Sequence, residues 1–104
     1  MALVASAAGD APRAEAAFRD WVRLAPREPQ AHAAYGRFLF ELGRKPEARE
    51  VLARAATEFP GAGIVWFHFQ AVLEALGETT AAAEAKQRAE ALLAPMQRRS
   101  LTSG

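Results

Sequence analysis

The spacing of helix-breaking residues constrains this chain more than any other feature of its sequence. Gly9, Gly43 and Gly77 are evenly spaced along the chain, and the same interval separates Pro26 from Pro60. Glycine and proline interrupt helices, so the spacing divides the chain into units of equal length. The interval also separates two other prolines and three alanines, which are Pro12 and Pro46, and Ala14, Ala48 and Ala82. Breakers and small residues therefore recur where a repeated helical hairpin needs a turn or a close approach.

The composition favours helices within each unit. Alanine fills 26 of the 104 positions, whereas valine, isoleucine and threonine are scarce. Alanine is the best helix former and β-branched residues favour strands, so we expect an all-α fold without strands. The connections are short, which makes consecutive helices antiparallel neighbours. The predicted helices cover residues 2–8, 12–25, 29–42, 46–59, 63–76 and 79–94.

The residues at the ends of these segments fit specific positions of a helix. Each repeated glycine follows an apolar run and suits the left-handed position after a helix. Pro12, Pro29 and Pro46 suit the first helical turn, where a missing N–H group costs nothing. Residues after Pro95 have the composition of a tail, so we expect a flexible segment over 96–104.

Charge and cysteine content exclude several classes of function. The chain has 13 basic and 12 acidic side chains, and it has no cysteine. It therefore lacks thiolate metal ligands, and no basic stretch favours nucleic acid or an anionic membrane as a partner. The most apolar stretch, 64–76, is too short to span a bilayer, and residues 1–8 lack the features of a secretion signal. We favour a cytoplasmic location and expect no membrane insertion. High alanine and an excess of arginine over lysine indicate a GC-rich bacterial source.

The repeated helix-turn-helix unit is about 34 residues long, with glycine and proline at fixed positions. Such a unit resembles the tetratricopeptide repeat. The middle unit, 29–62, agrees with the family pattern at His32, Tyr35, Gly36, Leu39, Ala48, Leu52 and Pro60. The third unit, 63–95, agrees at Trp66, Phe69, Leu73 and Ala82, and departs at Gln70 and Lys86. Residues 1–28 look like a truncated unit that keeps Gly9, Ala14, Phe18 and Pro26. The resemblance implies a short right-handed solenoid of about six helices.

In that family the first helices of successive units line a concave groove, and the resemblance implies a non-catalytic scaffold that binds a protein or peptide there. Phe40 and Phe67 would anchor an apolar segment, and Arg37 would pair with an acidic group of the partner. Glu41 and Glu74 would select against acidic partners. Alternatively, the two phenylalanines simply pack between helices. The implied groove residues are Gln30, Ala33, Ala34, Arg37, Phe40 and Glu41, with Ile64, Phe67, His68, Ala71 and Glu74.

The sequence contains no motif for catalysis. Nucleophile elbows, zinc-protease motifs and phosphate-binding glycine loops are all missing. His32 and His68 could be a metal pair, but two histidines without further ligands are a weak site, and His32 has a packing role in the tryptophan position of the repeat. We therefore expect no enzyme activity, cofactor or metal.

The predicted helix 12–25 suggests a second function, which is self-assembly. It carries more apolar side chains than residues 2–8 can cover. The uncapped end of a solenoid exposes apolar surface and tends to associate with other chains. The chain would then form a dimer or join a longer solenoid without a dedicated ligand. The predicted helix 79–94 instead has polar residues around most of its surface and looks like a terminal cap, which accounts for Lys86. The self-association face comprises Leu3, Val4, Phe18, Trp21 and Val22.

Overall fold

A computed structural model describes the backbone of residues 11–103 and the side chains of residues 11–93. These residues form helices and turns and contain no strand. Five predicted helices are confirmed to within a few residues at each end, except at the end of the last one. The predicted helix 2–8 lies outside the described residues. The helices are α2 (Ala11–Leu24), α3 (Pro29–Glu41), α4 (Lys45–Glu58), α5 (Gly63–Ala75) and α6 (Thr79–Ser103).

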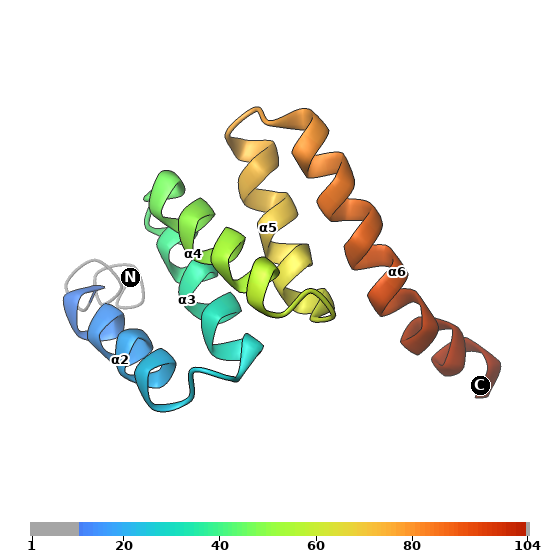
Figure 1. Ribbon diagram of the computed structural model, residues 1–104, viewed down its shortest axis with the longest axis horizontal. Coiled ribbons are helices and arrows are strands. Elements are labelled where there is room, and N and C mark those ends of the chain that lie inside the picture. Colours follow the sequence, from blue (N-terminus) through green and yellow to red (C-terminus); the bar gives the residue numbers. More distant parts are fainter. Residues whose placement is uncertain (1–10, 104) are drawn as a thin grey trace, which may run out of the picture.

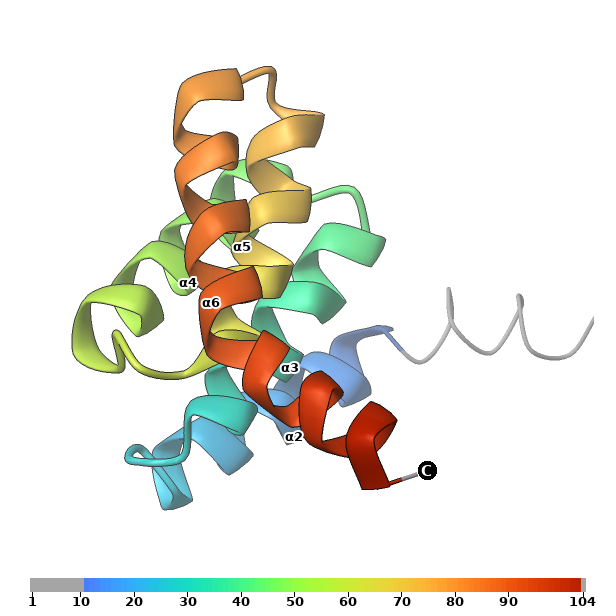
Figure 2. The same cartoon turned by 90° about the vertical axis from the view of Figure 1, so that its right-hand side faces the viewer.

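The helices follow one another across the molecule in chain order, and neighbours run antiparallel (Figure 1). α3 packs against α2, α4 and α5, while α5 packs against α3, α4 and α6. Figure 2 shows the α5–α6 hairpin from its own side. The two complete predicted units are thus helical hairpins, α3–α4 and α5–α6, with α2 packed on the first of them.

The turn inside each hairpin is built by a glycine. Gly43 has a φ of 84° and Gly77 has a φ of 80°, as predicted from their positions after apolar runs. The N–H of Gly43 donates to the carbonyl of Phe40 at 2.9 Å, and that of Arg44 donates to Leu39 at 2.9 Å. The same two bonds recur at the equivalent positions of the second hairpin. Glycine is required there because other residues adopt this conformation at a cost.

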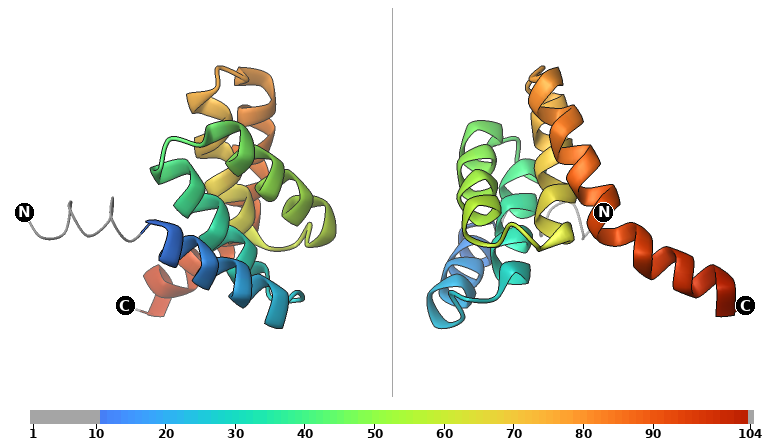
Figure 3. Two further views of the ribbon diagram at one scale, coloured as in Figure 1. Left: turned by 90° about the vertical axis from the view of Figure 1, so that its left-hand side faces the viewer. Right: turned by 45° about the vertical axis from the view of Figure 1, so that its right-hand side comes forward.

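The end of α6 differs from the prediction. Pro29 and Pro46 lie in the first turns of α3 and α4 as expected, but Pro95 lies inside α6, which continues to Ser103. A proline inside a helix costs about 3 kcal/mol, which is why the sequence predicts an end near residue 94. The strong helix formers of residues 91–94 instead carry the helix into the proline. Figures 1 and 3 show this last part of α6 lying clear of the other described helices.

The core consists mainly of alanine and leucine, so the helix axes approach closely. At Gly36 in α3, an added Cβ would lie 2.5 Å from Cγ of Leu52 in α4, so this contact has no room for a larger residue. All buried side-chain nitrogen and oxygen atoms of the described residues have a hydrogen-bond partner. The buried apolar residues are Ala31, Ala33 and Leu39 of α3, Ala48, Leu52, Ala55 and Ala56 of α4, Val65, Val72 and Leu73 of α5, and Ala82, Ala85 and Ala89 of α6.

Two aromatic rings fasten the turns between units. Nε2 of His32 lies 2.9 Å from the carbonyl oxygen of Pro26, and Nε1 of Trp66 donates to the carbonyl of Pro60 at 2.9 Å. The two rings are one repeat interval apart, as are the two prolines. The ring of His32 also packs 5.5 Å from that of Phe59. The packing role predicted for His32 is therefore what the structure shows.

Candidate binding groove

The first part of the candidate site is a hollow between α3 and its neighbours α2 and α5, with a volume of about 340 Å³. Predicted groove residues spaced by three or four positions along α3 reach it from one face of that helix. Ala33 is only 1% exposed, so it offers little surface to a ligand. The hollow is lined by Phe18, Gln30, Ala33, Ala34, Arg37, Phe38, Glu41, Ile64 and His68.

A second hollow of about 300 Å³ adjoins the first between α3 and α5. Arg37, Glu41 and His68 line both hollows, so the two adjoin at these three side chains. We call the two hollows together the α3–α5 groove. Glu74 lines neither hollow, whereas the other predicted groove residues are all brought together in it. The second hollow is completed by Phe40, Phe67, Ala71 and Val72.

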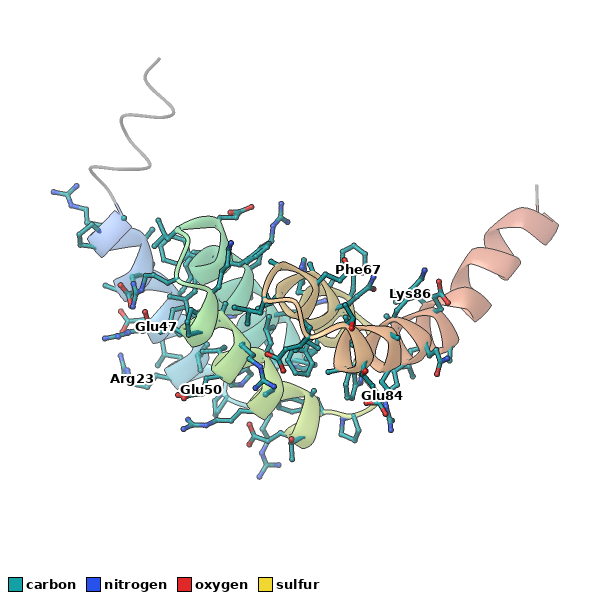
Figure 4. All side chains as sticks on the ribbon, turned by 90° about the horizontal axis from the view of Figure 1, so that it is seen from above. Arg23, Glu47, Glu50, Phe67, Glu84 and Lys86 are labelled. Carbon is teal, nitrogen blue, oxygen red and sulfur yellow. The ribbon has the colours of Figure 1, made fainter. Side chains whose placement is uncertain are left out.

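The exposed apolar surface of the groove comes from α5. Phe67 is 53% exposed and Ile64 is 37% exposed, and the ring of Phe67 stands edge-on to that of His68 at 5.3 Å. Figure 4 shows Phe67 at the outer edge of α5, on the same side as Lys86 of α6. Phe40 is half-buried and packs against the core cluster around Leu52, so it fits the alternative in which a phenylalanine packs between helices. Phe67 is therefore the accessible aromatic side chain of the groove.

The charges of the groove are already paired within the chain. Nε of Arg37 lies 3.1 Å from Oε2 of Glu41, one helical turn away. Glu74, which lines neither hollow, accepts a hydrogen bond from Nε2 of Gln70 at 3.1 Å. An acidic group of a partner would thus compete with Glu41 for Arg37.

The half-buried His68 lies between these charges and Phe67. Burial lowers the pKa of its imidazole, the nearby Arg37 guanidinium lowers it further, and Glu41 acts in the opposite direction. The ring is therefore uncharged at neutral pH. The middle of the groove therefore presents a neutral ring beside the Arg37–Glu41 ion pair.

A family model described as tetratricopeptide repeat matches residues 1–63, which is more than half of the chain. The chain belongs to the tetratricopeptide repeat family. The predicted family is confirmed, and the match covers α2 and the complete α3–α4 unit. Comparisons with curated proteins and with solved structures give no match.

Helix α2 of this tetratricopeptide chain carries a second apolar surface. Phe18 packs against Phe38 with ring centroids 4.9 Å apart, and Val22 is half-buried. Trp21 is 39% exposed and donates its indole N–H to Oε2 of Glu28 at 3.3 Å. Leu24 is 74% exposed, and its place three residues after Trp21 is the signal that could have added it to the predicted face. Leu3 and Val4 lie outside the described residues.

Figure 1 shows α2 at one end of the row of helices, and the left view of Figure 3 shows it in front of the other described helices. A third, more open depression of about 600 Å³ follows one face of α4. Four charged side chains, Arg49, Glu50, Arg54 and Glu58, line it together with Pro46, Ala53 and Thr57, and no aromatic residue is among them. None of the described helices is both long and apolar enough to cross a membrane. The tetratricopeptide units thus offer two apolar surfaces, the α3–α5 groove and the outer side of α2.

Proposed function

We propose that the chain is a non-catalytic scaffold, folded as a short right-handed solenoid, that binds an apolar segment of a protein or peptide in the α3–α5 groove. Tetratricopeptide repeats generally mediate contacts between proteins. The observation that carries the proposal is the exposure of Phe67 beside two adjoining hollows. Large exposed apolar side chains next to a concave surface mark binding sites more often than isolated ones do.

The chemistry of the groove defines the segment that fits it. Phe67 and Ile64 offer apolar contact area, while Arg37 and Glu41 neutralise each other at the centre. A ligand with an apolar side chain against Phe67 and an uncharged backbone beside His68 leaves that ion pair intact. Burying one such side chain contributes about 2 kcal/mol, or roughly thirtyfold in affinity.

The proposal is tested with peptides selected on the wild-type chain from a random display library. Each peptide is then measured by fluorescence anisotropy against Phe67→Ala and against Leu24→Ala, a matched control that removes an exposed apolar side chain outside the groove. We expect Phe67→Ala to lower the affinity about thirtyfold and Leu24→Ala to leave it unchanged. Peptides that bind both variants equally, or that lose affinity only with Leu24→Ala, would refute the groove as the site.

A second function, self-association through α2, is favoured by the exposure of Leu24 and Trp21. In that case the chain sediments as a dimer at high concentration, and Leu24→Asp makes it a monomer because a charge cannot be buried at the interface. Phe67→Asp is the matched control and leaves the dimer intact. A wild-type chain that stays monomeric at millimolar concentration excludes this function.

A further inference from the structure

Two ion pairs occupy equivalent positions in successive units, but their charges are exchanged. Oε1 of Glu15 in α2 lies 2.8 Å from Nη1 of Arg44, in the turn between α3 and α4. Nη2 of Arg49 in α4 donates to Oε1 of Glu78 at 2.7 Å, in the turn between α5 and α6. Arg49 is the equivalent of Glu15 one repeat later, and Glu78 is the equivalent of Arg44. The acid is thus on the helix in the first pair and on the turn in the second.

Each pair fastens one unit to the next. The first joint is the packing of α2 on the α3–α4 hairpin, and the second joint is the packing of α3–α4 on the α5–α6 hairpin. In both joints two nitrogens of the guanidinium donate to the two oxygens of the carboxylate. Such two-point contacts have a fixed geometry, which makes the pair sensitive to which unit is the neighbour.

The surroundings of the two pairs differ. At the first joint Glu15 also contacts Arg19 at 3.2 Å and the hydroxyl of Tyr35 at 3.3 Å, and Arg44 also contacts Glu47 at 2.6 Å. One repeat later these three neighbours are replaced by uncharged residues, Ala53, Phe69 and Ala81. The charges of the second joint can therefore be exchanged without creating repulsion from these neighbouring positions.

We propose that the exchanged charges form a joint-specific code that makes each helix accept the hairpin that follows it in the chain and reject the wrong hairpin of a second copy. If α2 packed on the α5–α6 hairpin of another molecule, Glu15 would face Glu78. If α4 packed on the α3–α4 hairpin of another molecule, Arg49 would face Arg44. Both wrong joints bring like charges together, whereas both correct joints bring opposite charges together.

Such a code is useful because the apolar faces of α2 and α4 are similar at some equivalent positions, although Trp21 of α2 stands where α4 has Ala55. Ala14 and Phe18 on α2 are equivalent to Ala48 and Leu52 on α4, and similar apolar faces allow exchange of hairpins between copies. The charged pairs at the edge of each joint distinguish the correct hairpin from the wrong one, which the apolar contacts do not. Salt screens them, so the discrimination weakens as the salt concentration rises.

The test exchanges the charges of the second joint. Arg49→Glu and Glu78→Arg each place like charges at that joint, whereas the double variant restores attraction with the polarity of the first joint. Glu50→Arg with Arg54→Glu is the matched control, because it exchanges the same residue types on the exposed face of α4. All full-length variants are unfolded in urea and refolded at high concentration. Dimer content is then measured by size-exclusion chromatography with light scattering, in low salt and in 1 M salt.

We expect each single variant to raise the equilibrium constant for unfolding about two- to fivefold, and the double variant to restore most of it. In low salt the refolded double variant contains several times more hairpin-exchanged dimer than the wild type. Salt raises the dimer content of the wild type toward that of the double variant. The control contains as much dimer as the wild type at each salt concentration. A double variant that forms no more dimer than the wild type in low salt overturns the code, as does a wild type whose dimer content is independent of salt.

Discussion

Replacing Gly36 with alanine measures how closely α3 and α4 approach each other. The added Cβ would lie 2.5 Å from Cγ, 2.6 Å from Cδ2 and 3.0 Å from Cδ1 of Leu52. Leu52 is fully buried, so its side chain has no open space into which it can turn. Overpacking of this kind costs about 1–3 kcal/mol, while alanine in place of glycine inside a helix returns about 1 kcal/mol. We expect the free energy of unfolding to fall by about 1 kcal/mol, and by at most about 2 kcal/mol.

The decisive measurement repeats this substitution in a Leu52→Ala background. Leu52→Ala alone costs about 2–5 kcal/mol because it leaves a cavity beside Gly36. The same methyl group then enters free space, so Gly36→Ala becomes neutral or stabilises the chain by up to about 1 kcal/mol. Urea unfolding followed by circular dichroism gives the four free energies, and Gly61→Ala, where an added Cβ meets nothing within 4 Å, is the control. An equal loss of stability in both backgrounds would refute the assignment of the clash to Leu52.

Four further substitutions or conditions test other parts of the fold. Burial lowers the folded-state pKa of His68, so stability begins to fall as the pH drops below about 6.5. His68→Gln removes this step from a plot of the urea midpoint against pH. Arginine partners lower the pKa of Glu15 and Glu78, so a second loss occurs as the pH falls below about 4.5, and a midpoint that rises toward acid would contradict both assignments. Trp66→Phe loses one hydrogen bond to the preceding turn and lowers the free energy of unfolding by about 1–2 kcal/mol in urea titrations. Gly77→Ala costs about 1 kcal/mol from its backbone conformation alone, and an unchanged urea midpoint would show that the turn rearranges.

The sequence predicts the helices well because their ends are set by local chemistry. Gly43 and Gly77 adopt the left-handed backbone conformation that follows the end of a helix. Predicting such a helix end needs only the local sequence. Pro95 lies inside α6 although a proline is costly there, so a proline by itself does not fix the end of a helix. The ion pairs between units escape notice for a different reason. Local spacing pairs Glu15 with Arg19 one turn away. Its other partner, Arg44, lies outside the reach of local spacing and meets Glu15 only because α2 packs on the α3–α4 hairpin.

The groove shows why repeat register alone could not assign each binding residue. The family resemblance assigns Phe40 and Phe67 the same anchoring role, but Phe40 packs on the core cluster around Leu52 and Phe67 stays exposed. Ala33 is the equivalent of Phe67 one repeat earlier, and it is buried in the cluster that α5 contributes to. The exposure of a position therefore depends on the unit that packs after it. The periodicity of one helix carries no information about that unit.

The same comparison helps to decide what the exposed Phe67 is for. Lys86 and Glu90 on α6 are equivalent to Leu52 and Ala56 on α4, which are both buried by the α5–α6 hairpin and the rest of the core. A further hairpin stacked in the same way would have to bury both charges, at a cost that an apolar contact with one phenylalanine does not offset. A segment lying in the α3–α5 groove covers Phe67 and leaves Lys86 and Glu90 in water. The charges on α6 thus favour a ligand in the groove over a longer stack as the partner of Phe67.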